Sequence, residues 1–476
     1  MSSVPTIVKT VFDEAAQRAF GGLCGDFNPI HVDPVYSRKV GAGRPIVHGV
    51  HLVLWSIEAL LEQCEVARID TGGIAKIAAT FRRPVYIGTE VEASVDLGTA
   101  DAVVQIGQAG NSCAEVRVSF GAIAASASPG PAADYASPGG PRPLAFAEVA
   151  GREGRFTPRF DAGVAGALFA RTLRVLGGHT LAELAGLSYL VGMECPGLFS
   201  LLSGFSVENR PRGRDAMEYR VVRADERFNL VRMRVSGGQL DGQVDAFLRP
   251  QPRQPSMAEI SGHVGRAEFV GQTALVVGGS RGIGEVTAKT VAAGGGRVVL
   301  TYVHGRDDAA RVMEEIRAAG GGCEILQFDV RSPDADLKAI ARHGPTHMYY
   351  FATPPIFVRR PMRIDERLLE DFWAVYVRGF SAVCGLVDHL EAGRLRIFYP
   401  SSVAVETPVA ELAEYAMAKA AGEVLCRILP MQDGRLSTLV HRLPRILTDQ
   451  TATVLNVPSA DALATMLPII REFHAS

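Results

Sequence analysis

The stretch Thr273-Ala-Leu-Val-Val-Gly-Gly-Ser-Arg-Gly-Ile-Gly284 decides the fold of the C-terminal part of the chain. Its first five residues predict a short buried strand, its glycines predict a tight turn, and the following EVTAKTVAA is compatible with a helix. A glycine-rich turn at this place lets the backbone approach a pyrophosphate, and the helix start supplies N–H donors. The candidate cofactor-binding residues of the turn are Gly278, Ser280, Arg281, Gly282, Ile283 and Gly284.

Further short strand candidates follow this stretch, and helical segments separate most of them. They are Val298–Tyr302, Glu324–Asp329, His347–Phe351, Arg396–Tyr399 and Thr438–Arg442. Such alternation is typical of an α/β, doubly wound parallel sheet.

A second group of polar residues lies far downstream of the glycine turn. Ser402 stands at a strand end, and Tyr415 and Lys419 are spaced four apart, which places both on one face of a helix. A lysine ammonium beside a phenol stabilises the phenolate and lowers its pKa, so that the tyrosine can donate a proton near neutral pH. The alternative is an ordinary exposed helix pair.

The glycine turn, the strand-end serine and the YAMAK run together resemble the short-chain dehydrogenase/reductase family, specifically its 3-ketoacyl-thioester reductases. The resemblance covers about residues 270–450. It implies a Rossmann fold, a nicotinamide cofactor, catalytic Ser402, Tyr415 and Lys419, and an Asp329 that contacts the adenine region. Tyr415 and Lys419 are expected to contact the cofactor as well.

The expected form of the cofactor is NADPH. An NAD enzyme places a carboxylate near the end of its second strand, whereas Arg297–Tyr302 carries no acid there. Arg281 and Arg306 are placed to meet a 2′-phosphate; alternatively, both are simply solvated.

Two features depart from the reductase family. Its Asn-Asn-Ala-Gly stretch is here Tyr350-Phe-Ala-Thr353, and no asparagine occurs between Asn229 and Asn456, so the asparagine that holds a relay water is missing. These departures count against reductase activity.

The most informative N-terminal run is Gly25-Asp-Phe-Asn-Pro-Ile-His-Val-Asp33. Its Asn-Pro turn can aim Asp26 and His31 at one point, where an imidazole moves protons and a carboxylate orients water. The run Gly43-Arg-Pro-Ile-Val-His-Gly49 follows, and N–H groups at the helix start can polarise a carbonyl oxygen. The alternative is purely structural: a helix-capping Asp26, a loop-bonded His31 and a packing Gly49.

These two runs together look like the MaoC-type (R)-specific enoyl-thioester hydratases, which have a hot-dog fold. The match runs over about residues 8–122 and includes Phe81-Arg-Arg-Pro-Val-Tyr-Ile-Gly88. It implies that Asp26 and His31 are the catalytic pair and that the Gly49 N–H holds the thioester oxygen. Leu54 stands where some members carry a serine.

The N-terminal and middle segments show the same order of elements, a helix followed by strands, which favours α+β folds. In the first, Ile46–Leu61 precedes four strand candidates: Ile74–Phe81, Glu90–Leu97, Ala102–Gln108 and Ala114–Gly121. In the second, Leu181–Val191 precedes Gly197–Glu208, Ala216–Arg223, Leu230–Val235 and Val244–Leu248. The middle segment therefore resembles a second hot-dog unit, although it has no Asp/His motif. We expect it to be a catalytically silent partner.

Two linker-like stretches, 125–143 and 248–268, give the domain boundaries. The predicted domains are a hot-dog hydratase domain over 1–125, a second hot-dog-like domain over 144–250, and a Rossmann reductase domain over 268–476. In the middle domain, Cys195 is either a nucleophile or a small residue in a tight turn, and the absence of a neighbouring histidine favours the turn.

Composition narrows the class of protein. The 476 residues contain 49 Lys+Arg against 51 Asp+Glu, a balance that argues against nucleic-acid binding. No apolar run is long enough for a membrane span, and the N-terminus becomes acidic too early for a signal peptide. The seven cysteines lack CxxC spacing, which favours reduced thiols in a cytoplasmic protein over disulfides or a metal site.

The combined prediction is a bifunctional enzyme that reduces a 3-ketoacyl thioester with NADPH and dehydrates the (R)-3-hydroxyacyl product to a trans-2-enoyl thioester, or runs in reverse. The thioester carrier is coenzyme A or acyl carrier protein, and both resemblances imply a homo-oligomer. Three alternatives remain: a hydratase with a non-reducing, nucleotide-binding or scaffold Rossmann domain, a non-catalytic carrier-binding module, and a reductase of a non-thioester ketone.

Overall fold

The computed structural model describes residues 6–40, 43–69, 72–121, 139–212, 214–250, 253–333, 336–356, 364–391, 393–452 and 457–476. Most of the predicted linker 125–143 lies outside these residues. The chain divides into two compact units, Met1–Gln251 and Pro252–Ala452 with Val457–Ser476. No helix in the described ranges combines the length and apolarity needed to cross a membrane.

The first unit is built on one ten-stranded antiparallel sheet of order β1-β3-β4-β5-β2-β7-β10-β9-β8-β6. The strands are β1 (Thr6–Val11), β2 (Ile74–Phe81), β3 (Glu90–Leu97), β4 (Asp101–Gln108), β5 (Asn111–Phe120), β6 (Glu153–Phe156), β7 (Ser200–Asn209), β8 (Met217–Asp225), β9 (Leu230–Ser236) and β10 (Leu240–Leu248). The β2–β7 pair joins the two halves, and at Gly204 a side-chain Cβ would lie 2.6 Å from the Ala79 carbonyl oxygen. The two predicted hot-dog segments therefore share one sheet.

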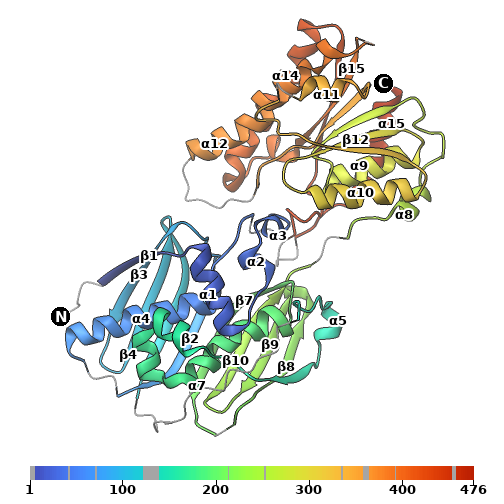
Figure 1. The fold of residues 1–476 in the computed structure, drawn as a ribbon. Helices are drawn as coiled ribbons and strands as arrows, with labels where there is room; N and C mark the ends of the chain where they lie inside the picture. Colours follow the sequence, from blue (N-terminus) through green and yellow to red (C-terminus); the bar gives the residue numbers. More distant parts are fainter. Residues whose placement is uncertain are drawn as a thin grey trace. The chain divides into compact units, whose positions relative to one another are not determined.

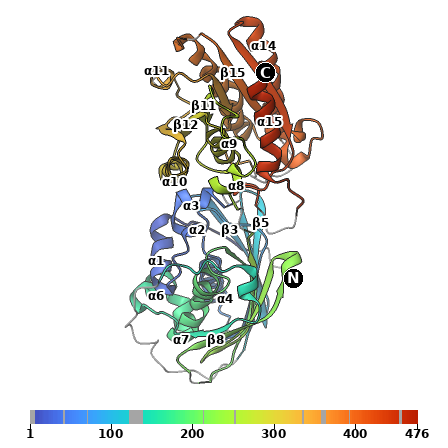
Figure 2. The same ribbon diagram turned by 90° about the vertical axis from the view of Figure 1, so that its right-hand side faces the viewer.

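Two long helices, α4 and α7, pack side by side against the curved sheet (Figures 1 and 2). The helices of this unit are α1 (Glu14–Cys24), α2 (Pro29–Val32), α3 (Pro34–Arg38), α4 (Gly49–Ala67), α5 (Phe146–Val149), α6 (Ala162–Leu168) and α7 (Ala170–Tyr189), with a π-helical turn η1 (Leu190–Glu194) and a 3₁₀ turn η2 (Glu226–Phe228). Leu54, Ile57 and Leu60 of α4 are fully buried. A helix that is apolar on most faces is stable only when other elements surround it.

The second unit contains a six-stranded parallel sheet of order β13-β12-β11-β14-β15-β16. Its strands are β11 (Thr273–Val277), β12 (Arg297–Tyr302), β13 (Gly322–Gln327), β14 (His347–Tyr350), β15 (Leu395–Ser402) and β16 (Leu436–Leu443). The strand order reverses between β11 and β14, and ligands of doubly wound sheets bind at the carboxyl edge beside such a reversal. The glycine turn follows β11, and Ser402 ends β15.

Helices cover both faces of this sheet, and each face has its own apolar cluster (Figure 1). They are α8 (Met257–Ser261), α9 (Gly282–Ala293), α10 (Arg306–Ala318), α11 (Leu337–Ala341), α12 (Glu366–Trp373), α13 (Phe380–Cys384), α14 (Ala413–Gln432) and α15 (Ala462–Ala475), with the shorter turns η3 (Ala374–Gly379), η4 (Gly385–His389), η5 (Val403–Val405) and η6 (Ala410–Leu412). Helices α9, α10 and α15 lie on one face, and α11 to α14 lie on the other.

The predicted double hot-dog followed by a doubly wound sheet is confirmed, and the differences concern single elements. The sequence analysis missed β1 and β6, which are edge strands with no fully buried side chain. It also began the middle helix at Leu181, whereas α7 begins at Ala170. Gly177, at φ 75° and ψ 163°, interrupts the helical pattern inside α7.

Candidate active sites

The loop that carries Asp26 and His31 is shaped by its own capping residues. Gly25 ends α1 with a φ of 81°, a conformation that favours glycine. Asn28 caps α2, and its side chain accepts a hydrogen bond from the Ile30 N–H. Asp26 precedes the bend, and His31 lies in the one-turn helix α2 that follows it.

Asp26 is buried, and both of its carboxylate oxygens accept hydrogen bonds. The Asn28 N–H donates to Oδ1 at 3.0 Å, and the Ser188 hydroxyl donates to Oδ2 at 2.7 Å. Burial raises the pKa of Asp26, while His31, Ser188 and Asn28 oppose that rise. The carboxylate is therefore fixed in orientation by two donors.

The tautomer of His31 follows from its hydrogen bond. Its Nδ1 lies 2.8 Å from the carbonyl oxygen of Ile46, which can only accept, so Nδ1 carries the proton and the neutral ring keeps its lone pair at Nε2. Burial lowers the pKa of His31, the Arg249 guanidinium acts in the same direction, and Asp26 opposes both. The ring is thus prepared to accept a proton at Nε2.

The sequence analysis did not assign a role to His48 or Gln17. The His48 ring stacks on His31 with centroids 3.8 Å apart. Its Nδ1 lies 2.8 Å from Gln17 Oε1, and its Nε2 lies 3.1 Å from the backbone oxygen of Asp26. A ligand atom from each of Asp26, His31 and His48 lies within 4.8 Å of the others, but both His48 nitrogens are engaged by protein oxygens that would compete with a metal ion.

Gly49 is the first residue of the 19-residue helix α4. Within the described part of the chain, its N–H is bonded to no protein acceptor. A side-chain Cβ at this position would lie 3.1 Å from both the Phe81 ring and Leu202. The helix start can therefore present an N–H to a ligand oxygen, and the contact of Gly49 with a thioester oxygen stays a prediction.

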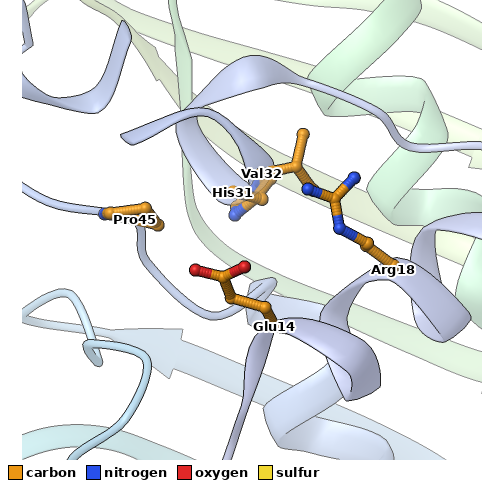
Figure 3. Close-up of a pocket in the computed structure, with 5 residues that line it drawn as sticks. All are labelled: Glu14, Arg18, His31, Val32 and Pro45. Carbon is orange, nitrogen blue, oxygen red and sulfur yellow. The ribbon is translucent and has the colours of Figure 1, made fainter. Parts of the chain in front are cut away.

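A hollow on the surface reaches His31 (Figure 3). It is lined by Glu14, Arg18, His31, Val32 and Pro45, and the Glu14 carboxylate points toward the side of the hollow where His31 lies. Asp26 is not among the lining residues. The imidazole is thus the member of the pair that is reached from the surface.

In the second unit, the glycine turn has the backbone geometry that the sequence predicted. Gly278 and Gly282 have φ values of 78° and 58°, and a Cβ at Gly284 would lie 2.5 Å from the Gly278 carbonyl oxygen. The Gly278 and Gly279 N–H groups are tied to Thr301 of β12. The turn therefore accepts no side chain at Gly284.

Several side chains that were predicted to bind the cofactor have contacts within the protein or are partly buried. Arg281 forms an ion pair of 2.6 Å with Asp449, which competes with its predicted contact to a 2′-phosphate. Ser280 and Ile283 are partly buried in the turn and the first turn of α9. Asp329 follows β13, and its Oδ1 accepts a hydrogen bond from the Arg331 N–H at 2.9 Å.

Ser402, Tyr415 and Lys419 are brought together by β15 and α14. Burial raises the pKa of Tyr415, and the nearby Ser402 hydroxyl opposes that rise. The sequence analysis expected the Lys419 ammonium to lower the pKa of this phenol, but Nζ lies 5.9 Å from the Tyr415 ring centroid. In this structure the tyrosine is therefore held as a neutral phenol.

Lys419 is buried and has aromatic neighbours that the sequence analysis missed. Its Nζ donates to the Pro400 carbonyl at 2.7 Å and lies 3.9 Å from the ring centroid of Tyr376 and 4.8 Å from that of Tyr399. Burial lowers the pKa of Lys419 to about 7. The Tyr376 hydroxyl contacts the Thr353 hydroxyl. Tyr376 thus lies beside Lys419 in a helical segment that contains no asparagine.

Cys195 is fully buried, and burial raises the pKa of its thiol to about 12. A thiol that stays protonated at neutral pH is a poor nucleophile. This environment favours the interpretation of Cys195 as a small residue in a tight turn.

Two family models match the chain. Residues 3–116 match the MaoC like domain, and residues 272–349 match the short chain dehydrogenase model. The second match covers the glycine turn and ends before Ser402, Tyr415 and Lys419.

Curated relatives match each of these regions separately. The (R)-specific enoyl-CoA hydratase of Aeromonas caviae is 35% identical over 88 residues, which are 18% of this chain and 62% of the hydratase. The hydroxynaphthalene reductase of Aspergillus fumigatus is 31% identical over 180 residues, which are 36% of this chain and 65% of the reductase. The chain thus spans less than two thirds of the length of either relative. A dehydrogenase/reductase structure from Sinorhizobium meliloti 1021 is 24% identical, with 44% of this chain and 90% of that chain covered and a TM-score of 0.38.

Proposed function

We propose, on the premise that this chain joins a MaoC-like domain to a short-chain dehydrogenase domain, that it performs two consecutive reactions on one acyl thioester. The second unit reduces a 3-ketoacyl thioester to the (R)-3-hydroxyacyl thioester. The first unit then removes water to give the trans-2-enoyl thioester, or adds water in the reverse direction. The observation that carries the proposal is that one chain holds both the Asp26–His31 loop and the Ser402–Tyr415–Lys419 group.

In hydration, the oxygen of water bonds to C3 of the enoyl group while its proton passes to His31 Nε2. Asp26 orients the water, and a proton returns from the pair to C2, so the pair ends in its starting state. Negative charge develops meanwhile on the thioester oxygen, and the Gly49 N–H at the start of α4 stabilises it. Dehydration is the same sequence in reverse.

The second unit offers a fitting place for a dinucleotide. Helix α9 begins within the glycine turn at Gly282, Gly284 in its first turn accepts no side chain, and β12 ends in Tyr302 without a carboxylate. The residues that would hold NADPH are Gly278, Ser280, Arg281, Gly282, Ile283, Gly284, Asp329, Tyr415 and Lys419. When bound, NADPH supplies the hydride that reduces the ketone carbon. Arg281 would be the residue to hold a 2′-phosphate, and its ion pair with Asp449 would compete with that contact.

The residues of the chain supply the proton for the reduction. Ser402 donates a hydrogen bond to the substrate carbonyl oxygen, and Tyr415 transfers its phenol proton to the same oxygen as the alcohol forms. A charged Lys419 stabilises the phenolate left behind. Reduction of this kind yields the (R)-alcohol that a MaoC-type hydratase accepts, and covalent fusion raises the effective concentration of this shared intermediate.

The test is product analysis by mass spectrometry with NADPH and a short 3-ketoacyl thioester, presented on coenzyme A and on acyl carrier protein in parallel. Wild-type protein is expected to give the enoyl thioester, D26N to stop at the hydroxyacyl thioester, and Y415F to leave the substrate unchanged. A wild-type protein that transforms neither ketoacyl nor enoyl thioesters would overturn the proposal and favour a non-catalytic carrier-binding module.

A second candidate function is a hydratase whose Rossmann domain binds a nucleotide without reduction. The Arg281–Asp449 pair and the lack of an asparagine in the sequence between Asn229 and Asn456 favour it. It predicts measurable NADPH binding, no NADPH oxidation with any ketoacyl thioester, and full hydration of a supplied enoyl thioester.

A further inference from the structure

The Asp26 loop lies against the middle segment, which has no Asp/His motif of its own. Ser188, near the end of α7, donates its hydroxyl to Asp26 Oδ2 at 2.7 Å. Only 5% of Ser188 and 1% of Asp26 is exposed, so water does not compete for this bond. Half of the hydrogen bonding to the catalytic carboxylate therefore comes from the second hot-dog half.

Gly192 makes room for that carboxylate. It lies in the π-helical turn η1, directly after α7, and a side-chain Cβ there would lie 2.4 Å from Asp26 Oδ1 and 2.7 Å from Oδ2. Real Cβ atoms do not approach other atoms this closely, so any larger residue would displace Asp26. The position requires glycine because of the carboxylate, since its own φ is not in the left-handed region.

The same segment also holds the asparagine of the loop. Asn28 Nδ2 donates to the Gly192 carbonyl at 2.9 Å and lies 3.4 Å and 3.3 Å from the carbonyls of Gly197 and Leu198. The Asn28 N–H is the other donor to Asp26. Both donors to the carboxylate therefore depend on residues 188–198.

We propose that Ser188 is a positioning residue of the hydration reaction, and that the middle segment supplies half of the active site through Ser188 and Gly192. This inference rests on the proposed hydratase function. The Ser188 hydroxyl fixes the plane of the Asp26 carboxylate and stabilises its ionised form, so that the carboxylate faces the water that His31 activates. On this proposal the second hot-dog half is necessary for catalysis although it has no Asp/His motif.

The test compares S188A with S56A in the hydration of a short 2-enoyl thioester. Ser56 is a matched control because it is a buried serine of the central helix α4, and its hydroxyl donates to the Val53 carbonyl of the same helix. Loss of a hydrogen bond to a charged group predicts a fall in kcat/KM of about tenfold to a hundredfold for S188A, while S56A stays near wild type.

The pH profile separates positioning from a loss of folded protein. Because Ser188 stabilises ionised Asp26, its removal moves the acidic limb of kcat/KM to higher pH, whereas a smaller folded fraction lowers activity equally at every pH. The other titratable groups against Asp26 are His31, His48 and Cys24, and S188A changes none of them.

A G192A variant tests the space that Gly192 leaves for the Asp26 carboxylate. It is expected to lose at least as much kcat/KM as S188A, while NADPH-dependent reduction in the same preparations is unchanged. The inference is wrong if the wild-type protein hydrates enoyl thioesters and S188A has the same kcat/KM and the same acidic limb as the wild type. If wild-type protein hydrates none, the proposed hydratase function itself has failed.

Discussion

Replacing Tyr376 by leucine is expected to weaken ketoacyl reduction through Lys419 rather than through the substrate. Lys419 is buried, and its ammonium lies 3.9 Å from the Tyr376 ring centroid. Among the described residues, this ammonium donates one hydrogen bond, to the Pro400 carbonyl oxygen. A desolvated cation–π contact is worth about 2 kcal/mol. Leucine keeps the apolar volume and removes the ring face, so the charged form of the lysine loses that stabilisation.

The size of the effect on reduction follows from the pKa of Lys419. Its pKa is already lowered to about 7, so about half of the lysine is charged at pH 7. A loss of about 2 kcal/mol lowers the pKa by about 1.5, since one pKa unit equals about 1.4 kcal/mol. Only about 3% of Lys419 would then be charged at pH 7, and reduction at that pH is expected to fall about fifteenfold.

The assay is kcat/KM for NADPH-dependent reduction between pH 5 and 9. The basic limb is expected to move toward lower pH in Y376L, and the variant should recover most of its activity at the acidic end of the range. Y376F is the matched control, because it keeps the ring and removes only the hydroxyl that contacts Thr353. A Y376L profile that is lowered evenly at all pH values, with its basic limb unmoved, would refute the cation–π argument.

Three further outcomes are expected. G284A should weaken NADPH binding at least a hundredfold, because its Cβ would lie 2.5 Å from the Gly278 carbonyl oxygen. Fluorescence titration measures this binding, and enoyl hydration by the same variant should be unaffected. Burial lowers the pKa of the His31 imidazole from the ordinary histidine value of about 6.5, so the ring stays neutral to lower pH and hydration by the wild-type protein should persist below pH 6.5. An H31Q variant that keeps wild-type hydration activity would contradict this role. L60A should lower the free energy of unfolding of the first unit by about 2–5 kcal/mol, because Leu60 is fully buried in α4, and urea denaturation measures this directly.

The sequence predicted most of the architecture because its signals were local. The strands Ile74–Phe81 and Glu90–Leu97 were predicted at their observed bounds, since alternating burial follows from the residues themselves. The edge strand β1 was missed because its apolar residues Ile7 and Val11 are largely exposed and its pairing depends on the distant β3. Pairing partners are not encoded in a strand's own pattern.

The residues of the candidate sites also fall into two groups, those with a local sequence signal and those without one. Gly25, Asn28 and the Asn-Pro bend are local, and they allowed Asp26 and His31 to be recognised. Tyr376 and Ser188 carry no local signal, since a tyrosine or serine on an apolar helix usually packs in a core. Their roles depend on side chains more than 40 and 160 residues away in the sequence, at Lys419 and Asp26 respectively.

The first unit is asymmetric in what its two halves provide. The Asp26 loop comes from the N-terminal half, whereas Ser188 and the space at Gly192 come from the middle segment. In a pair of identical halves, both copies would have to keep the Asp26 loop and also the residues that contact it, which here are Ser188 and Gly192. In a fused pair one half can keep the Asp26 loop while the other keeps the residues that contact it. Each half is then free to lose the residues that the other half supplies. Absence of the Asp/His motif in the middle segment is therefore compatible with strong selection on residues 188–198, and substitutions there should act as active-site substitutions although no catalytic motif includes them.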